Sequence, residues 1–247
     1  MYEKPDLYNA DCMEAMKEFP DNFFDLAVVD PPYGDAGAGG GTTGSEDCGT
    51  DTKRWNRFGQ RFDRYKQISM GWVSRTGGTW AEKYGKKIIE WDVAPGKEYF
   101  DELFRVSRNQ IIWGGNYFDL PPTRCFLIWR KLRISENFSM AMCEYAWTSF
   151  NGNAKLYECA PQGTSSDMRF HPTQKPVSLY QWILDRYAME GFRILDTHAG
   201  SASSLIACHR AGLEGWGFEI NEGYYKKAKE RLEREKAQSN IFEMLSK

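Results

Sequence analysis

The sequence predicts an α/β fold, with a mostly parallel sheet and helices on both of its faces. Along most of the 247 residues, short apolar runs of strand length alternate with segments of helical periodicity, as in parallel sheets. Two of these runs end in an acidic residue, Asp30 and Asp196, where a turn begins. Ligands of such folds bind at the carboxyl ends of the strands, so both turns are candidate sites.

A short helix is expected over residues 9–20, close behind a first strand. Asp11 and Glu14 have the spacing of a capping box, and Pro20 ends the helix. The apolar run Leu26–Val29 predicts a buried strand that leads to Asp30. The later elements are expected as a helix at 98–106, strands at 110–113, 125–130 and 143–150, a helix at 177–189, a strand at 193–196, a helix to about 211, a strand at 215–219 and a charged helix from 222 to about 237.

The length fits a single domain, 1–247, that carries an insert at about 34–97. The insert begins with a glycine-rich loop, and its stretch 53–87 holds ten Lys or Arg against two acids, hence a net charge of +8, with seven aromatic residues interleaved. This combination favours contact with double-stranded DNA, and the alternative is a solvated basic loop. The candidate DNA-contacting residues are Lys53, Arg54, Trp55, Arg57, Arg61, Arg64 and Lys66.

The composition argues against several other classes of protein. No apolar stretch is long enough to span a bilayer, and the N-terminus lacks the apolar segment of a secretory signal, so we expect a cytoplasmic protein. The six cysteines form no Cys-x-x-Cys pair and the three histidines are scattered, so no metal site is expected. A net charge of −2 means that contact with nucleic acid must come from a local patch.

The first candidate site is the tetrapeptide Asp30, Pro31, Pro32 and Tyr33. The two prolines fix the backbone and have no N–H to donate, so the carbonyls of Asp30 and Pro31 can accept hydrogen bonds. Together with the carboxylate and the aromatic ring they suit a planar group that bears an NH2, such as the edge of a nucleobase. The alternative is a strand that simply ends at a proline turn.

The second candidate site is the turn from Asp196 to Ser201, which opens a helix. Gly200 lets a ligand approach the backbone, and Glu219, at the end of the next strand, has the place of the acid that binds ribose hydroxyls in nucleotide-binding folds. A purely structural turn fits this pattern about equally well. Ala202 stands where the dinucleotide fingerprint has a second glycine, and no Gly-Lys-Ser or Gly-Lys-Thr motif indicates a nucleoside triphosphate.

A third feature is the constrained loop from His171 to Pro176, just before the helix that leads into the Asp196 strand. Its polar and cationic groups can meet a carboxylate ligand near the Asp196 turn. The alternative is a loop that the prolines make rigid, with Lys175 in solvent.

Together these three blocks resemble the amino-methyltransferases of DNA that use S-adenosylmethionine. The tetrapeptide at 30–33 matches their catalytic motif completely, and the His-Pro-Thr-Gln-Lys-Pro and Asp-x-x-Ala-Gly-Ser blocks also match. The catalytic block at Asp30 comes before the cofactor block at Asp196, an order that is similar to the permuted β group of these enzymes. Residues 7–33, 98–150 and 171–232 carry the resemblance, and 114–118 and 144–150 are similar to segments of phage and prophage members.

The resemblance implies a Rossmann-like, seven-stranded sheet that binds S-adenosylmethionine. It implies that the Asp196 turn lies over the methionine part, that Glu219 takes the ribose hydroxyls, and that Asp11 and Cys12 meet the adenine ring. The loop 171–176 is expected to hold the methionine carboxylate. The expected cofactor-binding residues are Asp11, Cys12, Asp30, His171, Thr173, Gln174, Lys175, Asp196, Ala199, Gly200, Ser201, Ser203, Glu219, Ile220 and Asn221. His198 and Ala202 differ from the apolar and glycine residues usual at their positions.

The implied reaction is methyl transfer to N6 of an adenine that has left the DNA duplex. Asp30 and the Pro31 carbonyl would hold the amine, and Tyr33 would stack on the base. One alternative is transfer to N4 of cytosine, where Ser is more frequent than Asp at position 30. Others are methylation of a protein amide or of RNA, for which Asn-Pro-Pro-Tyr is typical, and base recognition without catalysis. The resemblance also implies a homodimer, a role in restriction–modification and a prokaryotic or phage-encoded source.

Overall fold

The computed structural model describes residues 2–33, 93–134, 141–161 and 169–245, with side chains up to residue 238. The chain divides into two compact units. The first consists of Met1–Pro31, Pro95–Leu132 and Cys143–Lys247, and the second of Pro32–Ala94 and Arg133–Met142. Most of the predicted insert at 34–97 lies outside the described residues, so the single domain with an insert stays a prediction. The elements below belong to the first unit.

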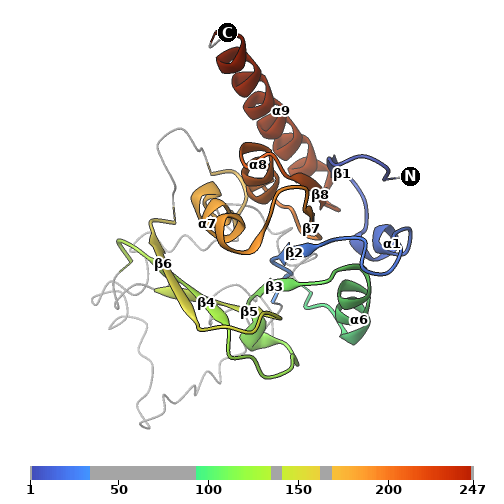
Figure 1. The fold of residues 1–247 in the computed structure, drawn as a ribbon, viewed down its shortest axis with the longest axis vertical. Helices are drawn as coiled ribbons and strands as arrows, with labels where there is room; N and C mark the ends of the chain where they lie inside the picture. Colours follow the sequence, from blue (N-terminus) through green and yellow to red (C-terminus); the bar gives the residue numbers. More distant parts are fainter. Residues whose placement is uncertain (1, 34–92, 135–140, 162–168, 246–247) are drawn as a thin grey trace, which may run out of the picture. The chain divides into compact units, whose positions relative to one another are not determined.

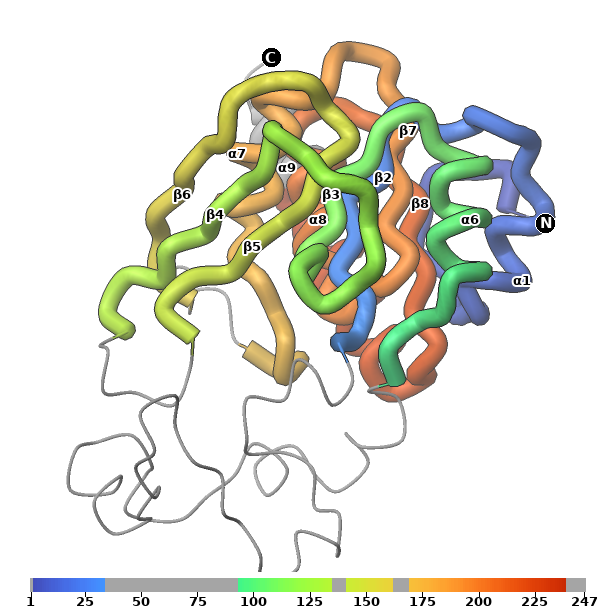
Figure 2. Tube along the Cα trace, turned by 90° about the horizontal axis from the view of Figure 1, so that it is seen from below, coloured from blue at the N-terminus to red at the C-terminus, as the bar shows by residue number. Residues whose placement is uncertain are grey.

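The described part of this unit contains one eight-stranded sheet (Figure 2). Its strands lie in the order β1-β8-β7-β2-β3-β5-β4-β6, and β5 runs antiparallel to both of its neighbours. The other pairings are parallel, so the mostly parallel α/β fold is confirmed. The strands are β1 Leu7–Tyr8, β2 Leu26–Val29, β3 Gln110–Trp113, β4 Phe126–Lys131, β5 Cys143–Thr148, β6 Lys155–Cys159, β7 Arg193–Asp196 and β8 Glu214–Phe218.

The expected count of seven strands is wrong by one, because the sequence pattern did not reveal β6. This strand lies at the edge of the sheet and pairs only with β4. Its Leu156 is 56% exposed, and two of its five residues, Lys155 and Glu158, are charged. An edge strand with an exposed side needs no continuous apolar run, so it left no clear signal in the sequence.

Helices cover both faces of the sheet (Figure 1). The alternation of side chains along β2 decides which residue meets which layer. Leu26 and Val28 share a core with α7, α8 and α9, whereas Ala27 and Val29 share one with α1 and α6. Burial on both faces explains why β2 is apolar throughout. The helices are α1 Cys12–Met16, α6 Lys97–Val106, α7 Val177–Tyr187, α8 Ser203–Arg210 and α9 Glu222–Leu245, with a short 3-10 turn η1 at Gly115–Tyr117.

Two helices differ in length from their prediction. The helix expected at 9–20 is the much shorter α1, in which the Asp11 carboxylate accepts a hydrogen bond from Met13 N at 2.7 Å. Glu14 pairs with Lys17 at 2.7 Å instead of completing a capping box. Helix α9 runs to Leu245 rather than 237. No helix in the described part of the chain combines the length and apolarity that a bilayer span requires.

The contact between η1 and β5 gives a test of this packing. A Cβ added to Gly115 would lie 2.4 Å from the Trp147 Cβ and 3.1 Å from the Trp147 backbone nitrogen, so the backbone would have to move. We expect Gly115→Ala to lower the free energy of unfolding by about 2 kcal/mol, as overpacking of a core does. Urea denaturation measures it. Gly152→Ala is the control, because its added Cβ would meet only the Cys125 sulfur at 3.7 Å. Equal stabilities of the two variants would contradict the packing.

Candidate active site

Four neighbouring strands bring four acidic residues together where the strands have their carboxyl ends. This border of the sheet, which runs across the strands, is the edge at which the candidate active site lies. In the order β1-β8-β7-β2 all pairings are parallel, so all four carboxyl ends meet there. Asp11 lies shortly after β1, Glu219 and Asp30 directly follow β8 and β2, and Asp196 is the last residue of β7. The two predicted sites, although far apart in the sequence, therefore lie side by side at this edge.

Asp30 forms an ion pair with Lys175 from the loop before α7. The side chains of Asp30 and Lys175 are only 11% and 4% exposed. Lys175 also lies 3.1 Å from the carboxylate of Glu144, so the same ammonium contacts two carboxylates. The alternative with Lys175 in solvent is thereby excluded. Pro31, whose carbonyl is the second predicted acceptor, is buried directly after Asp30.

Asp196 shapes the turn between β7 and α8. Its carboxylate accepts hydrogen bonds from the backbone nitrogen of His198 at 3.1 Å and from the Ser204 hydroxyl. Burial raises the pKa of Asp196 to about 6, although both hydrogen bonds act in the opposite direction. Gly200 has φ +51° and Ala202 has φ +59°, so two residues of the turn adopt the left-handed conformation. Ala202 thus occupies a position that a glycine would adopt without strain.

Glu219 is bound to the same turn. Its carboxylate accepts from Gly200 N at 3.0 Å and from Asn221 N at 2.8 Å. The Asn9 amide donates to the Glu219 carbonyl at 2.7 Å and so joins the end of β1 to this segment. Burial raises the pKa of Glu219 to about 7 despite the two backbone donors. A carboxylate and a glycine backbone are thus held together, as a nucleoside site needs.

Helix α9 is hydrogen-bonded to the turn between β7 and α8. The buried guanidinium of Arg231 donates to the Ser201 carbonyl at 2.7 Å and to the Ser203 hydroxyl at 2.9 Å. The two serine hydroxyls are 3.1 Å apart. Ala199, also buried, donates its backbone N–H to the Phe218 carbonyl at 2.9 Å. The predicted cofactor-binding residues Ala199, Ser201 and Ser203 therefore belong to one segment that hydrogen bonds hold to α9 and to the end of β8.

The His171 loop packs against this turn. A Cβ on Gly200 would meet ring atoms of His171 at 3.2–3.4 Å, and the His171 ring lies edge-on to Tyr224 with centroids 4.4 Å apart. Burial lowers the pKa of His171 to about 3, so the ring is neutral near pH 7. Gln174 is buried and accepts from Phe170 N at 3.3 Å, whereas Thr173 is exposed. The loop is thus part of the site's wall.

Four of the expected cofactor-binding residues remain: two cap helices, one is a buried thiol and one is exposed. Asp11 caps α1, and the Asn221 side chain accepts from the backbone nitrogens of Gly223 and Tyr224 at 3.0 Å, which caps α9. Burial raises the pKa of Cys12 to about 12, so it is a thiol. Ile220 is 63% exposed. Their contacts with a cofactor stay predictions.

Some residues at this edge were not found from the sequence. The Tyr99 hydroxyl of α6 lies 2.6 Å from the Thr197 hydroxyl, which lies 2.9 Å from the His198 ring. Glu144 and its partner Lys131 come from two strands of the antiparallel part of the sheet. The one signal in the sequence that could have indicated Glu144 is the presence of an acidic residue within an otherwise apolar strand.

Several predicted residues cannot be placed at this site. Pro32 and Tyr33 belong to the second compact unit, so their roles stay predictions. The candidate DNA-contacting residues between Lys53 and Lys66 lie outside the described part of the chain.

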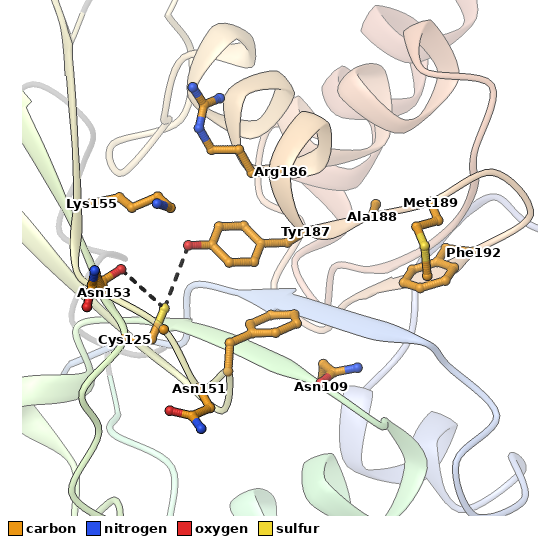
Figure 3. A pocket seen from close by; sticks show the side chains of 12 residues that line it. Asn109, Cys125, Asn151, Asn153, Lys155, Arg186, Tyr187, Ala188, Met189 and Phe192 are labelled. Atoms are coloured by element: carbon orange, nitrogen blue, oxygen red, sulfur yellow. Dashed lines mark hydrogen bonds between the residues drawn. The ribbon is translucent and has the colours of Figure 1, made fainter.

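A cavity of about 450 Å³ lies at the amino ends of the strands, opposite to the candidate active site (Figure 3). Asn109, Cys125 and Phe192, which line it, directly precede β3, β4 and β7. The Cys125 sulfur lies 3.7 Å from both the Asn153 carbonyl and the Tyr187 hydroxyl. The described residues that line this cavity include none of the predicted site residues, so it is separate from the candidate active site.

The contact between Gly200 and His171 gives a prediction. An alanine at Gly200 would suffer both the left-handed backbone and the crowding of the His171 ring. We expect Gly200→Ala to reduce the free energy of unfolding by about 2 to 3 kcal/mol. The control Gly212→Ala has a similar φ of +67° but nothing within 4 Å of the added Cβ, so it should lose only about 1 kcal/mol. If Gly200→Ala and Gly212→Ala lost the same unfolding free energy, the His171 ring would not restrict the side chain at position 200.

The raised pKa of Glu219 gives a second prediction. The folded state keeps this carboxyl protonated up to about pH 7, while its ordinary pKa is 4.5. The stability it contributes is therefore complete below about pH 4.5 and is lost as the pH rises towards 7, by up to about 3 kcal/mol. Glu219→Gln should flatten the dependence of the unfolding free energy on pH in this window, leaving the slope due to Asp196. Exposed Glu158→Gln should retain the wild-type slope, and the same slope in Glu219→Gln would refute the burial argument.

Comparison with known proteins gives a family match for part of the chain. Residues 112–230, just under half of the chain, match the DNA methylase family N6_N4_Mtase. The type II methyltransferase M.HpaI of Haemophilus parainfluenzae is 22% identical over 252 residues, which cover 92% of this chain and 73% of that protein.

Solved structures share the fold. The M1.HpyAVI–SAM complex has a TM-score of 0.51 at 17% identity, over 92% of this chain and 98% of that one. The cytosine-N4-specific PvuII DNA methyltransferase has a TM-score of 0.52 at 11% identity, over 94% and 93%. The family match includes the His171 loop and the Asp196 turn, whereas Asp30 to Tyr33 lie outside it. Residues 112–230 are thus similar to the N6_N4_Mtase family of DNA methylases.

Proposed function

We propose that this protein transfers a methyl group from S-adenosylmethionine to the exocyclic N6 amino group of adenine in double-stranded DNA. The observation that carries the proposal is that Asp30 and the Gly200–Glu219 turn lie at the ends of adjacent parallel strands. A site for the amine and a site for the methyl donor would then be neighbours, as direct transfer requires. The proposal is finer than the family assignment, which covers amino groups of both adenine and cytosine.

The residues fit the cofactor. Glu219 is an acceptor for vicinal hydroxyls, and Gly200 leaves space where any other residue would place a Cβ against His171. Bound S-adenosylmethionine supplies an electrophilic methyl carbon on a sulfonium. The buried carboxyl groups of Asp196 and Glu219 lie at this edge, and Asp30 is near enough to contribute to the raised pKa of Asp196. A cationic cofactor suits this edge better than an anionic nucleotide does.

Asp30 and Pro31 prepare the acceptor. The amino group of adenine is a poor nucleophile because its lone pair is delocalised into the ring. Hydrogen bonds from its two hydrogens to the Asp30 carboxylate and the Pro31 carbonyl would localise and orient that lone pair. The target base has to leave the duplex, which costs a few kcal/mol of stacking and pairing. Positioning then contributes more than basicity does.

The choice between adenine and cytosine rests on Asp30, because Ser is more frequent at this position in cytosine enzymes. The likeness to the cytosine-N4-specific enzyme is a likeness of fold at 11% identity and does not decide the base. N4 methylation of cytosine is therefore the second candidate. Methylating unmodified DNA, digesting it to nucleosides and identifying the product by mass separates the two. Recovery of N4-methylcytosine alone would overturn the adenine assignment.

The insert at 34–97 is proposed to contact the DNA backbone, since its stretch 53–87 has a charge of +8. This charge contrasts with the net charge of −2 of the whole chain. Aromatic residues such as Trp55 are suited to fill the gap left by an extruded base.

Removing the Asp30 carboxylate tests the proposed chemistry. We expect Asp30→Ala to lower methyl transfer from labelled S-adenosylmethionine to DNA by about a thousandfold or more, since the amine loses its orienting acceptor. Cofactor affinity, measured by calorimetry, should change little because Glu219 and Gly200 remain. Asp101→Ala is a matched control, because it removes a carboxylate that pairs with Lys97 on the surface of α6. Transfer at the wild-type rate by Asp30→Ala would exclude Asp30 from the reaction.

A further inference from the structure

Four charged side chains are joined by successive ion pairs in a row that ends at Asp30. Lys131 Nζ lies 2.6 Å from Glu144 Oε1, and Lys175 Nζ lies 3.1 Å from Glu144 Oε2. Lys175 then pairs with Asp30. The residues come from β4, β5, the loop before α7 and the end of β2. Glu144 thus lies between two ammonium groups, one of which contacts the proposed catalytic carboxylate.

Two tryptophans confine these ammonium groups. Lys131 Nζ lies 5.3 Å from the centre of the Trp129 ring, and Lys175 Nζ lies 5.4 Å from that of Trp113. The two rings meet edge-on at 6.5 Å, and both are buried. Each ammonium therefore has an aromatic face on one side and the Glu144 carboxylate on another. This arrangement leaves Lys175 few alternative positions.

This row of four side chains has no net charge, because it contains two ammonium groups and two carboxylates. Burial by itself would raise the pKa of Glu144, but the ammonium groups of Lys175 and Lys131 lower it to about 2. Burial would lower the pKa of Lys175, and the carboxylates of Asp30 and Glu144 outweigh it and raise that pKa. Both central members are therefore charged near pH 7. Loss of Glu144 would leave Asp30 as the carboxylate that holds Lys175 among the described residues.

We propose that Glu144 is a positioning residue for methyl transfer: as a second carboxylate besides Asp30, it anchors the Lys175 ammonium and so fixes the orientation of the Asp30 carboxylate. The inference rests on the proposed function. A lysine ammonium rotates freely on a flexible stem, and one anchor does not define its place. With Glu144 as a second anchor, Lys175 holds Asp30 in one orientation. The target amine then meets an acceptor that is already aligned.

The test is steady-state kinetics of Glu144→Gln, which keeps the shape of the side chain and removes its charge. We expect kcat to fall about tenfold or more, while the KM values for S-adenosylmethionine and for DNA stay within about twofold, because Glu144 touches neither. Glu144→Asp restores the charge and should recover most of the lost kcat. Glu158→Gln is the matched control. It breaks the exposed ion pair with Arg130 between β4 and β6, and its kinetics should equal those of the wild type.

A buried cation without its partner can also unfold the chain, so a charge-balanced variant is needed. Lys131→Met combined with Glu144→Gln removes one charge of each sign and leaves Lys175 paired with Asp30. Thermal unfolding and calorimetric binding of S-adenosylmethionine report whether this variant is folded. If Glu144 positions Lys175, the double variant is folded, binds the cofactor and still has the low kcat.

The outcomes separate the two claims. Wild-type kcat in Glu144→Gln, or full recovery of kcat in the double variant, overturns the positioning role and leaves the proposed function intact. A failure of Glu144→Asp to recover any rate does the same, since a charge near Lys175 would then be without effect. A wild-type protein that transfers no methyl group to DNA overturns both.

Discussion

The parallel pairing of β2 with β7, and of β7 with β8, is the constraint on which the candidate active site depends. Leu26 and Ala27 pair with Ile194 and Leu195, and Asp196 pairs with Gly217. This register brings Asp30, the Asp196 turn and Glu219 to one edge, although the first two lie far apart in the chain. The burial of β2 on both faces fixes the register, since a shift by one residue would exchange the side chains that meet the two helical layers.

Electrostatics at this edge divides into two parts. Asp196 and Glu219 are buried with backbone and hydroxyl donors, and their pKa values rise to about 6 and about 7. Asp30 instead faces the Lys175 ammonium, which also contacts Glu144, the ion-pair partner of Lys131. The half of the site that is proposed to receive a cation thus holds two buried carboxyl groups with no ion pair to a lysine or arginine among the described residues. The half that is proposed to orient a neutral amine carries a balanced chain of charges.

Local patterns in the sequence were enough to predict that Asp30, the Asp196 turn and Glu219 lie at strand ends. A strand followed by Asp-Pro-Pro, and a strand followed by a glycine turn with an acid after the next strand, are signals that span few residues. The contacts of Lys175 could not be predicted, because its partners Asp30 and Glu144 come from two different strands that are distant from it in the chain. Edge strand β6 was missed since its exposed side chains show no apolar run. The sequence did mark Ala202 as the place of a missing glycine, and its φ of +59° shows why a glycine suits that position.

A crystal structure of the protein with S-adenosylmethionine bound tests the central claim most directly, because it shows whether both halves serve one reaction. We expect the ribose hydroxyls to lie on the Glu219 carboxylate, the adenosine to pass over Gly200, and the methyl carbon to face the space beside Asp30 and the Pro31 carbonyl. A cofactor bound away from the carboxyl ends of β7 and β8, for example in the cavity around Cys125 and Tyr187, would contradict it.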